Sequence, residues 1–106
     1  MNLGHERLEV YQVALGVARW AAAQVIPPAR KHLRAQLVRA ADSMVLNIAE
    51  GAGHPPGESR RNHYRIAAGS ASEVGAVLDL VPLPGGPERQ DELRRVCAML
   101  AKMISR

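Results

Sequence analysis

Residues 29–51 read ARKHLRAQLVRAADSMVLNIAEG, and this stretch decides the fold class. Its apolar residues recur at spacings of three or four, which is the period of a helix with one buried face. They are Leu33, Leu37, Ala40, Met44 and Ile48. The alternation typical of a strand is absent. We therefore predict a helix from about Ala29 to Glu50, with Gly51 as the left-handed residue that caps its end.

Three further segments show the same helical period. They cover residues 5–25, 58–81 and 87–105. The residues expected to face inward are Leu8, Tyr11, Leu15, Ala18, Ala22 and Val25 in the first segment; Ile66, Ala67, Ser70, Val74, Val77, Leu78 and Val81 in the second; and Leu93, Val96, Cys97, Leu100 and Ile104 in the last. The small residues Ala67, Ala71 and Gly75 also form a stripe at spacing four, which lets another helix approach closely.

Proline and glycine separate the four predicted helices. The breaks are Pro27-Pro28, Gly51–Gly57 and Pro82–Pro87. Proline lacks an amide hydrogen and clashes with the preceding turn, so none of the breaks is expected to be helical. Short breaks between long helices make consecutive helices antiparallel neighbours. We predict a single all-α domain over residues 1–106, an antiparallel up-down-up-down four-helix bundle.

The composition limits the core and the class of partner. The 106 residues include one Trp, two Tyr and no Phe, so aliphatic side chains and alanine must fill the core. Chains with such thin cores often gain stability by oligomerising. The formal net charge is +4, and all but two of the 14 basic residues are Arg. This mild excess permits contact with nucleic acid or an acidic partner without demanding it.

The first residues and the single cysteine bear on the compartment. Charged residues interrupt the first ten positions, so no secretory signal pattern is present. The longest apolar run, residues 20–28, is too short to cross a bilayer. Cys97 has no second cysteine to pair with in the chain, which fits a reducing compartment. We expect a cytoplasmic protein with no membrane partner.

A line of polar residues runs beside the apolar face of the second predicted helix. It comprises Gln36, Arg39, Ser43, Asn47 and Glu50, and the third helix adds Ser70 and Glu73. Ser and Asn lower helix propensity because they compete for backbone hydrogen bonds. A purely solvated face is usually richer in Lys and Glu. The line is therefore either a solvated face or a structural hydrogen-bond network, inside the bundle or at a subunit contact; we predict the network.

The residues that could carry chemistry are poorly placed for it. None of the four histidines lies three or four positions from another histidine, or from an acidic residue in a known ligand spacing, and the Glu-x-x-His signature of di-iron bundles is absent. Cys97 stands in an apolar stretch, and Ser43 is in mid-helix without a strained turn or a neighbouring base. We therefore expect no catalytic residues, no metal site and no cofactor, and predict that the chain is not an enzyme.

Basic residues cluster where two predicted helices begin. One cluster is Arg30, Lys31 and Arg34, and the other contains Arg60, Arg61 and Arg65. Antiparallel helices place these clusters at opposite ends of the bundle. They are either solubilising residues with local ion pairs or candidate phosphate contacts. The second interpretation gains weight if assembly repeats each cluster.

Several strings resemble a known family. They are Leu8-Glu9-Val10-Tyr11, Gln36-Leu37-Val38-Arg39-Ala40-Ala41-Asp42-Ser43, Asn47-Ile48-Ala49-Glu50-Gly51, and Gly69-Ser70 with Glu73. They resemble the bacterial four-helix-bundle proteins first noted as open reading frames in intervening sequences of 23S rRNA genes. The resemblance covers essentially the whole chain. It implies a four-helix bundle that assembles as a ring-like homopentamer, and no established catalytic residues.

The resemblance also implies two kinds of function. The first is a homo-oligomeric interaction or scaffold module. The second is a basic nucleic-acid-binding accessory protein, because the accessory protein of diversity-generating retroelements, a basic pentamer that associates with a reverse transcriptase and nucleic acid, looks like a relative. The expected partners are thus further copies of the chain, and nucleic acid or a nucleic-acid-processing protein. His63 and Tyr64 stand where the family usually has aromatic or large apolar residues, and Ala68 where it often has a basic one. Because position 68 is alanine and not a basic residue, nucleic-acid binding is less strongly expected for this member.

Overall fold

The computed structural model describes residues 4–106, and all of their regular structure is helical. The elements in order are a short 3-10 helix η1 (Gly4–Arg7), α1 (Glu9–Ala22), a second short 3-10 helix η2 (Pro28–Arg30), α2 (Lys31–Gly53), α3 (Glu58–Leu80) and α4 (Gly86–Ser105). The all-helical class predicted from the period of the apolar residues is confirmed. None of these helices is both long and apolar enough to span a membrane.

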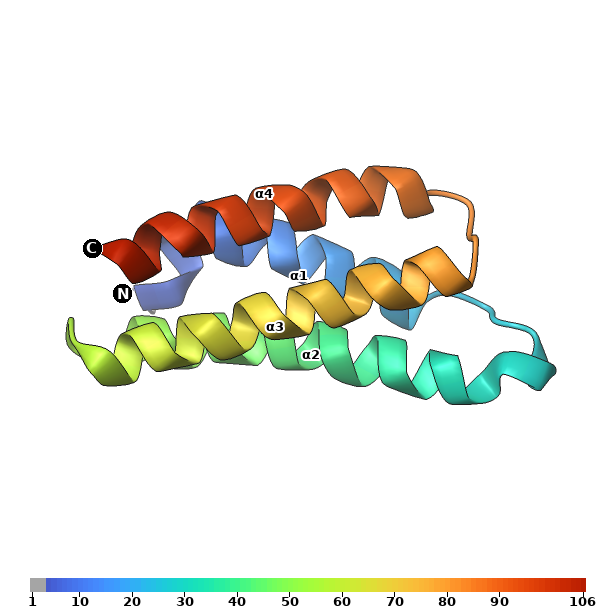
Figure 1. Cartoon of the computed structure of the whole chain (residues 1–106), viewed down its shortest axis with the longest axis horizontal. Coiled ribbons are helices and arrows are strands. Elements are labelled where there is room, and N and C mark those ends of the chain that lie inside the picture. Colours follow the sequence, from blue (N-terminus) through green and yellow to red (C-terminus); the bar gives the residue numbers. More distant parts are fainter. Residues whose placement is uncertain (1–3) are drawn as a thin grey trace.

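The four α-helices alternate in direction, as Figure 1 shows. Each packs on the next along the chain, and α4 closes the arrangement against α1. The contact between α2 and α3 is the most extensive of these. The start of α1 and the end of α4 both lie at the end of the bundle where α2 passes into α3, on the left of Figure 1.

Aliphatic side chains and alanines fill the core, as the composition predicted. The largest side chains that are fully buried belong to Val17, Leu37, Met44, Ile48, Val74, Val96 and Leu100. Tyr64 is buried with them, and in the described part of the chain no charged, amide, histidine or serine side chain is buried. Ala67 and Ala71 of the small-residue stripe are buried, and the side-chain amide of Gln90 on α4 donates to the Gly75 carbonyl oxygen over 2.9 Å. The stripe therefore serves helix packing within the chain.

The first helix is shorter than predicted at both ends. The prediction covered residues 5–25, whereas α1 begins at Glu9 and ends at Ala22. The ring of a proline clashes with the carbonyl group four residues before it, so a helix cannot continue through Ala23 to Pro27. The predicted inner face is also wrong at Ala22 and Val25, which are exposed, whereas Ala21 and Ile26 are buried.

The prediction that Gly51 caps the second helix is wrong. The helix continues through Gly51 to Gly53, and the cap is His54 in an extended conformation. Gly51 is buried against α3, where a Cβ atom would lie 2.7 Å from Cε1 of Tyr64 and 3.2 Å from the Arg60 carbonyl oxygen. Glycine is therefore needed here for a close approach between two helices. The predicted inner face of the third helix is also wrong at Ile66, which is 44% exposed.

Candidate functional site

Half-buried polar side chains connect α2 to α3. The hydroxyl oxygens of Ser43 and Ser70 lie 2.8 Å apart. The side-chain amide of Asn47 donates to the Ser43 carbonyl oxygen over 2.9 Å and contacts the Ser43 hydroxyl at 3.2 Å. Its carbonyl oxygen, Oδ1, lies 3.0 Å from Nδ1 of His63. A continuous series of hydrogen bonds thus links Ser70, Ser43, Asn47 and His63.

The structure brings together only part of the predicted polar line. Ser43, Asn47 and Ser70 join through hydrogen bonds between two helices of one chain. Gln36, Arg39, Glu50 and Glu73 lie outside this series. His63 ends the series, although it was not in the predicted set. No sequence signal identifies His63: it lies seven residues before Ser70 on α3, whereas Asn47 lies four residues after Ser43 on α2, and only the packing of the two helices brings them together.

The Asn47 side chain determines which His63 nitrogen carries a proton. The Ser43 carbonyl oxygen can only accept, so the amide nitrogen of Asn47 must face it. The amide oxygen then faces His63 and can also only accept. Nδ1 of His63 is therefore the donor, and in the neutral ring Nε2 keeps a free lone pair.

Two histidines and a carboxylate meet beside this series. The His54 and His63 rings are stacked, with centroids 5.1 Å apart and an interplanar angle of 13°. The potential ligand atoms of Glu50, His54 and His63 all lie within 4.8 Å of one another. The prediction of no metal site depended on the spacing between histidines and on the absence of Glu-x-x-His. It overlooked that Glu50 and His54 are four residues apart, and the sequence does not show that α3 brings His63 to them.

Arg60 closes the end of α2. Its Nε donates to the carbonyl oxygens of His54, over 2.9 Å, and Gly51, over 3.2 Å. Its Nη2 donates to the Ala52 carbonyl oxygen over 3.3 Å. The last carbonyl groups of a helix lack partners within it, and a cation near them also interacts favourably with the helix dipole. Arg60, one of the candidate phosphate contacts, therefore has a structural role.

The other candidate phosphate contacts differ in their surroundings. Arg61 and Arg65 form ion pairs with Glu58. The hydrogen bond from Arg65, and to a smaller extent the one from Arg61, holds the pKa of this exposed carboxyl below its usual value. At the other end of the bundle, Arg34 donates to the Ala22 carbonyl oxygen over 3.3 Å. Arg30 and Lys31 beside it are exposed.

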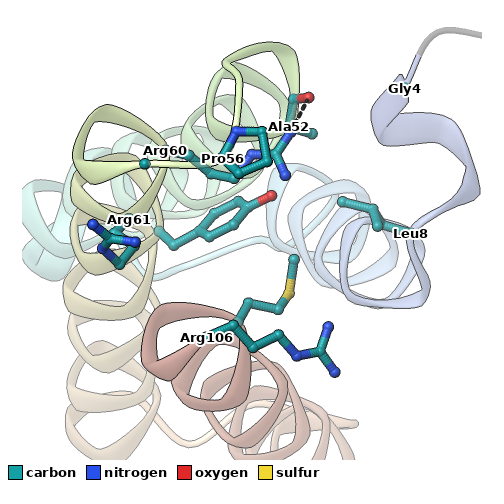
Figure 2. A pocket seen from close by; sticks show the side chains of 10 residues that line it. Gly4, Leu8, Ala52, Pro56, Arg60, Arg61 and Arg106 are labelled. Atoms are coloured by element: carbon teal, nitrogen blue, oxygen red, sulfur yellow. Dashed lines mark hydrogen bonds between the residues drawn. The ribbon is translucent and has the colours of Figure 1, made fainter.

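A cavity of about 590 Å³ opens at the end of the bundle where α1 begins and α4 ends. Figure 2 shows Arg60, Arg61 and Arg106 around it, with Leu8 on the opposite side. Tyr64 and Met103 contribute to its wall, and no acidic side chain lines it among the described residues. Burial raises the pKa of the Tyr64 hydroxyl, and the charge of Arg60 partly opposes this. The cavity is thus basic at its mouth.

A second hollow is apolar and lies between α1 and α2. It is lined by Leu15, Ala18, Arg19, Ala22, Asp42, Val45 and Leu46. Leu46 is 66% exposed there. On α3, Ile66 and Leu80 are also exposed and share one face, but fourteen residues at about 1.5 Å each put them roughly 21 Å apart, with the exposed Glu73 between them. The hollow is thus an apolar area, whereas α3 offers two isolated apolar side chains.

The candidate nucleophiles have unreactive surroundings. Burial raises the pKa of the Cys97 thiol, and a hydrogen bond with Ser72 opposes this only in part. A raised pKa lowers the fraction of thiolate, which is the nucleophilic form. Ser43 is engaged with Ser70 and Asn47.

The family model described as 23S rRNA-intervening sequence protein matches residues 6–106, nearly the whole chain. No curated protein matches the sequence.

Proposed function

Because the chain belongs to the 23S rRNA-intervening sequence protein family, we propose that it is a non-enzymatic interaction module that assembles with further copies of itself. The observation that carries this proposal is the apolar hollow between α1 and α2, with the exposed Leu46 at its rim. The resemblance drawn from the sequence makes a pentameric ring the expected form.

Two different surfaces suit a ring. A ring needs a head-to-tail contact in which one surface of a subunit meets a different surface of the next. The hollow between α1 and α2 is flanked by Arg19 and Asp42, and Glu73 lies between Ile66 and Leu80 on α3. The hollow of one subunit could therefore meet the isolated apolar side chains of α3 in the next subunit, with charged residues beside both surfaces.

The non-enzymatic part rests on the surroundings of the candidate nucleophiles. The Cys97 thiol has a raised pKa, and Ser43 is held in a hydrogen-bonded series without a general base aimed at it. A free cysteine also fits the cytoplasm, where we place the protein.

Native mass spectrometry and light scattering of the purified protein test the assembly. We expect a species of five times the 11.5 kDa chain mass at micromolar concentration. Leu46→Glu should shift the protein towards monomer, because it places a carboxylate in the apolar hollow. The matched control is Lys102→Glu, which adds a carboxylate at an exposed position of α4. A monomeric wild-type protein would refute the proposal.

Nucleic-acid binding is the second candidate function. The basic cavity favours it, because Arg106 lines this cavity and a guanidinium group can bind phosphate in two-pronged geometry. Arg60 and Arg61 already have partners within the chain, but their charges make the cavity more positive. Five copies of the chain would repeat this cavity around a ring. The exposed Arg30 and Lys31 offer a further basic area at the opposite end.

Filter binding with generic RNA and DNA at several salt concentrations tests this candidate. Phosphate contacts predict that affinity falls as salt rises, with little dependence on sequence. Arg106→Ala should weaken binding and reduce the salt slope by about one for each phosphate that Arg106 neutralises. Arg94→Ala is the control, because Arg94 is exposed on α4 and outside the cavity. Absence of binding at low salt, or binding without a salt slope, would exclude this function.

A further inference from the structure

We propose that Glu50, His54 and His63 form a binding site for a divalent transition-metal ion, with zinc as the best match. The three side chains offer two imidazole nitrogens and one carboxylate oxygen within 4.8 Å of one another. Imidazole suits zinc and its neighbours in the first transition series, and two histidines with one carboxylate is a known zinc ligand set. Three protein ligands would leave a coordination position for water.

The hydrogen bond from His63 to Asn47 prepares one ligand. Metal-binding histidines almost always donate their second ring N–H to a carbonyl or carboxylate oxygen, which fixes the tautomer and the ring orientation. The Asn47 amide oxygen accepts from Nδ1 of His63 in this way, so Nε2 is the nitrogen available to a metal. The Asn47 amide is held in turn by Ser43. The hydrogen-bonded series between α2 and α3 thus supports a metal ligand at its end.

The backbone at His54 is also held in place. Its N–H donates to the Gly51 carbonyl oxygen over 3.2 Å, and its own carbonyl oxygen accepts from Arg60 over 2.9 Å. His54 is the C-cap of α2, where Arg60 binds the terminal carbonyl groups and so fixes the backbone before an ion binds. Glu50 lies one turn earlier on the same helix face.

Binding requires a modest contraction of the cluster. Ligand atoms around tetrahedral zinc, with bonds of about 2.0–2.1 Å, lie roughly 3.3 Å from one another. The 4.8 Å span must therefore close, and the two stacked rings must turn towards one ion. Glu50 is exposed and both histidines are only half-buried, so these side chains have room to rotate. The ion would then tie the end of α2 to the second turn of α3.

Calorimetric titration of the protein with ZnCl₂, after removal of any affinity tag, tests the site. We expect one ion per chain with micromolar or tighter affinity. His54→Ala and His63→Ala should each weaken binding at least tenfold. The chain offers matched controls in His5→Ala and His32→Ala, because neither histidine belongs to the cluster. Counting ions per chain keeps this test independent of the proposed assembly.

Two further measurements separate the site from nonspecific binding. Co²⁺ in place of zinc should give visible absorption bands of a low-coordinate nitrogen and oxygen site, and these should disappear in His54→Ala. Asn47→Ala should retain one ion per chain and weaken binding about 10–100-fold, as removal of a histidine's hydrogen-bond partner typically does. Wild-type affinity in His54→Ala, or an equally weakened affinity in His32→Ala, would overturn the proposal. Circular dichroism checks the fold of each variant. If His63→Ala does not fold, the result for His54→Ala decides the test, because His54 lies outside the helices.

Discussion

Gly51 shows how one missing side chain determines where two helices meet. It lies in the last turn of α2 against the ring of Tyr64, which is only 2% exposed. A Cβ atom at Gly51 would lie 2.7 and 2.9 Å from two carbons of that ring and 3.2 Å from a backbone oxygen. The first two distances are shorter than real contacts, and a buried ring has little room to move.

Gly51→Ala should therefore destabilise the protein. Alanine raises helix propensity by about 1 kcal/mol, but inserting a methyl group into a packed contact typically costs about 1–3 kcal/mol or more. We expect a net decrease in the free energy of unfolding, measured with urea. Gly69→Ala on α3 is the control: a Cβ atom there meets nothing within 4 Å, so that variant should be at least as stable as wild type. Equal stabilisation of both variants would contradict the close contact.

At the residue scale, the sequence indicates that a glycine is needed at Gly51 but does not show which structural feature requires it. A glycine after a run of helical period is compatible with a cap, which was the prediction, and with a close crossing of helices. The choice depends on the Tyr64 ring, which belongs to a different helix. The same holds for His63: its importance follows from Asn47 and Glu50, which only the pairing of α2 with α3 brings near.

At the scale of elements, the pair α2 and α3 joins through the contact of Ser43 with Ser70 as well as through its apolar faces. This hydrogen bond is only part-buried, so water can replace part of what a mutation removes. The net contribution of such a hydrogen bond is about 0.5–1.5 kcal/mol.

A double-mutant cycle of Ser43→Ala and Ser70→Ala should show a coupling energy in that range, about 0.5–1.5 kcal/mol, because the two groups contact each other directly. The measurement is the free energy of unfolding of both single variants and the double variant. Ser43→Ala combined with Ser59→Ala provides the additive reference, since Ser59 is exposed and takes no part in the series. Additivity in both cycles would show that the Ser43–Ser70 contact contributes nothing.

The ends of helices could be predicted from the sequence where a nearby proline, glycine or acidic residue determines them. The predicted start of the third helix, Glu58, is that of α3, and Pro87 lies in the first turn of α4 after Gly85 with its positive φ of 84°. The first helix was predicted to continue to Val25, whereas it ends at Ala22, because the ring of Pro27 clashes with a helical carbonyl group at Ala23. Local chemistry thus sets helix ends, while contacts between helices decide cases such as Gly51.

At the scale of the whole molecule, Tyr64 links the stability of the bundle to alkaline pH. Burial raises the pKa of its hydroxyl in the folded chain, whereas the unfolded chain has the ordinary value of about 10. Between these two pKa values the folded state binds more protons than the unfolded state. Stability is therefore complete below about pH 10 and decreases as the pH rises towards the folded-state pKa.

When the pH is raised from neutral to strongly alkaline, the free energy of unfolding should decrease less in Tyr64→Phe than in the wild-type protein, because phenylalanine has no hydroxyl group to ionise. The comparison needs urea unfolding of both proteins at each pH, because Cys97 and other groups also titrate in this range and affect both alike. The difference between the two proteins isolates the phenol. If the stability of both proteins decreases equally with pH, the pKa of the Tyr64 hydroxyl is the same in the folded and unfolded states, and the prediction is wrong.

The antiparallel arrangement was accessible from the sequence because it depends on helix lengths and on three short breaks. The basic cavity was not, because Arg60 and Arg61 come from α3 and Arg106 follows α4. Neighbouring helices at one end of a bundle bring together residues that are far apart along the chain. A prediction of such a site requires the register of all four helices.

The closeness of Gly4 to Arg106 has a topological consequence. Both residues line the same cavity, while the turn from Pro82 to Gly85 lies at the opposite end of the bundle. A short tether of glycine and serine could join residue 106 to residue 4 in a chain that is opened in that turn instead. The order of helices would become α4, α1, α2, α3 with every helix contact retained. In a circularly permuted chain of this kind, a fused protein would project from the end of the bundle opposite to Gly4 and Arg106.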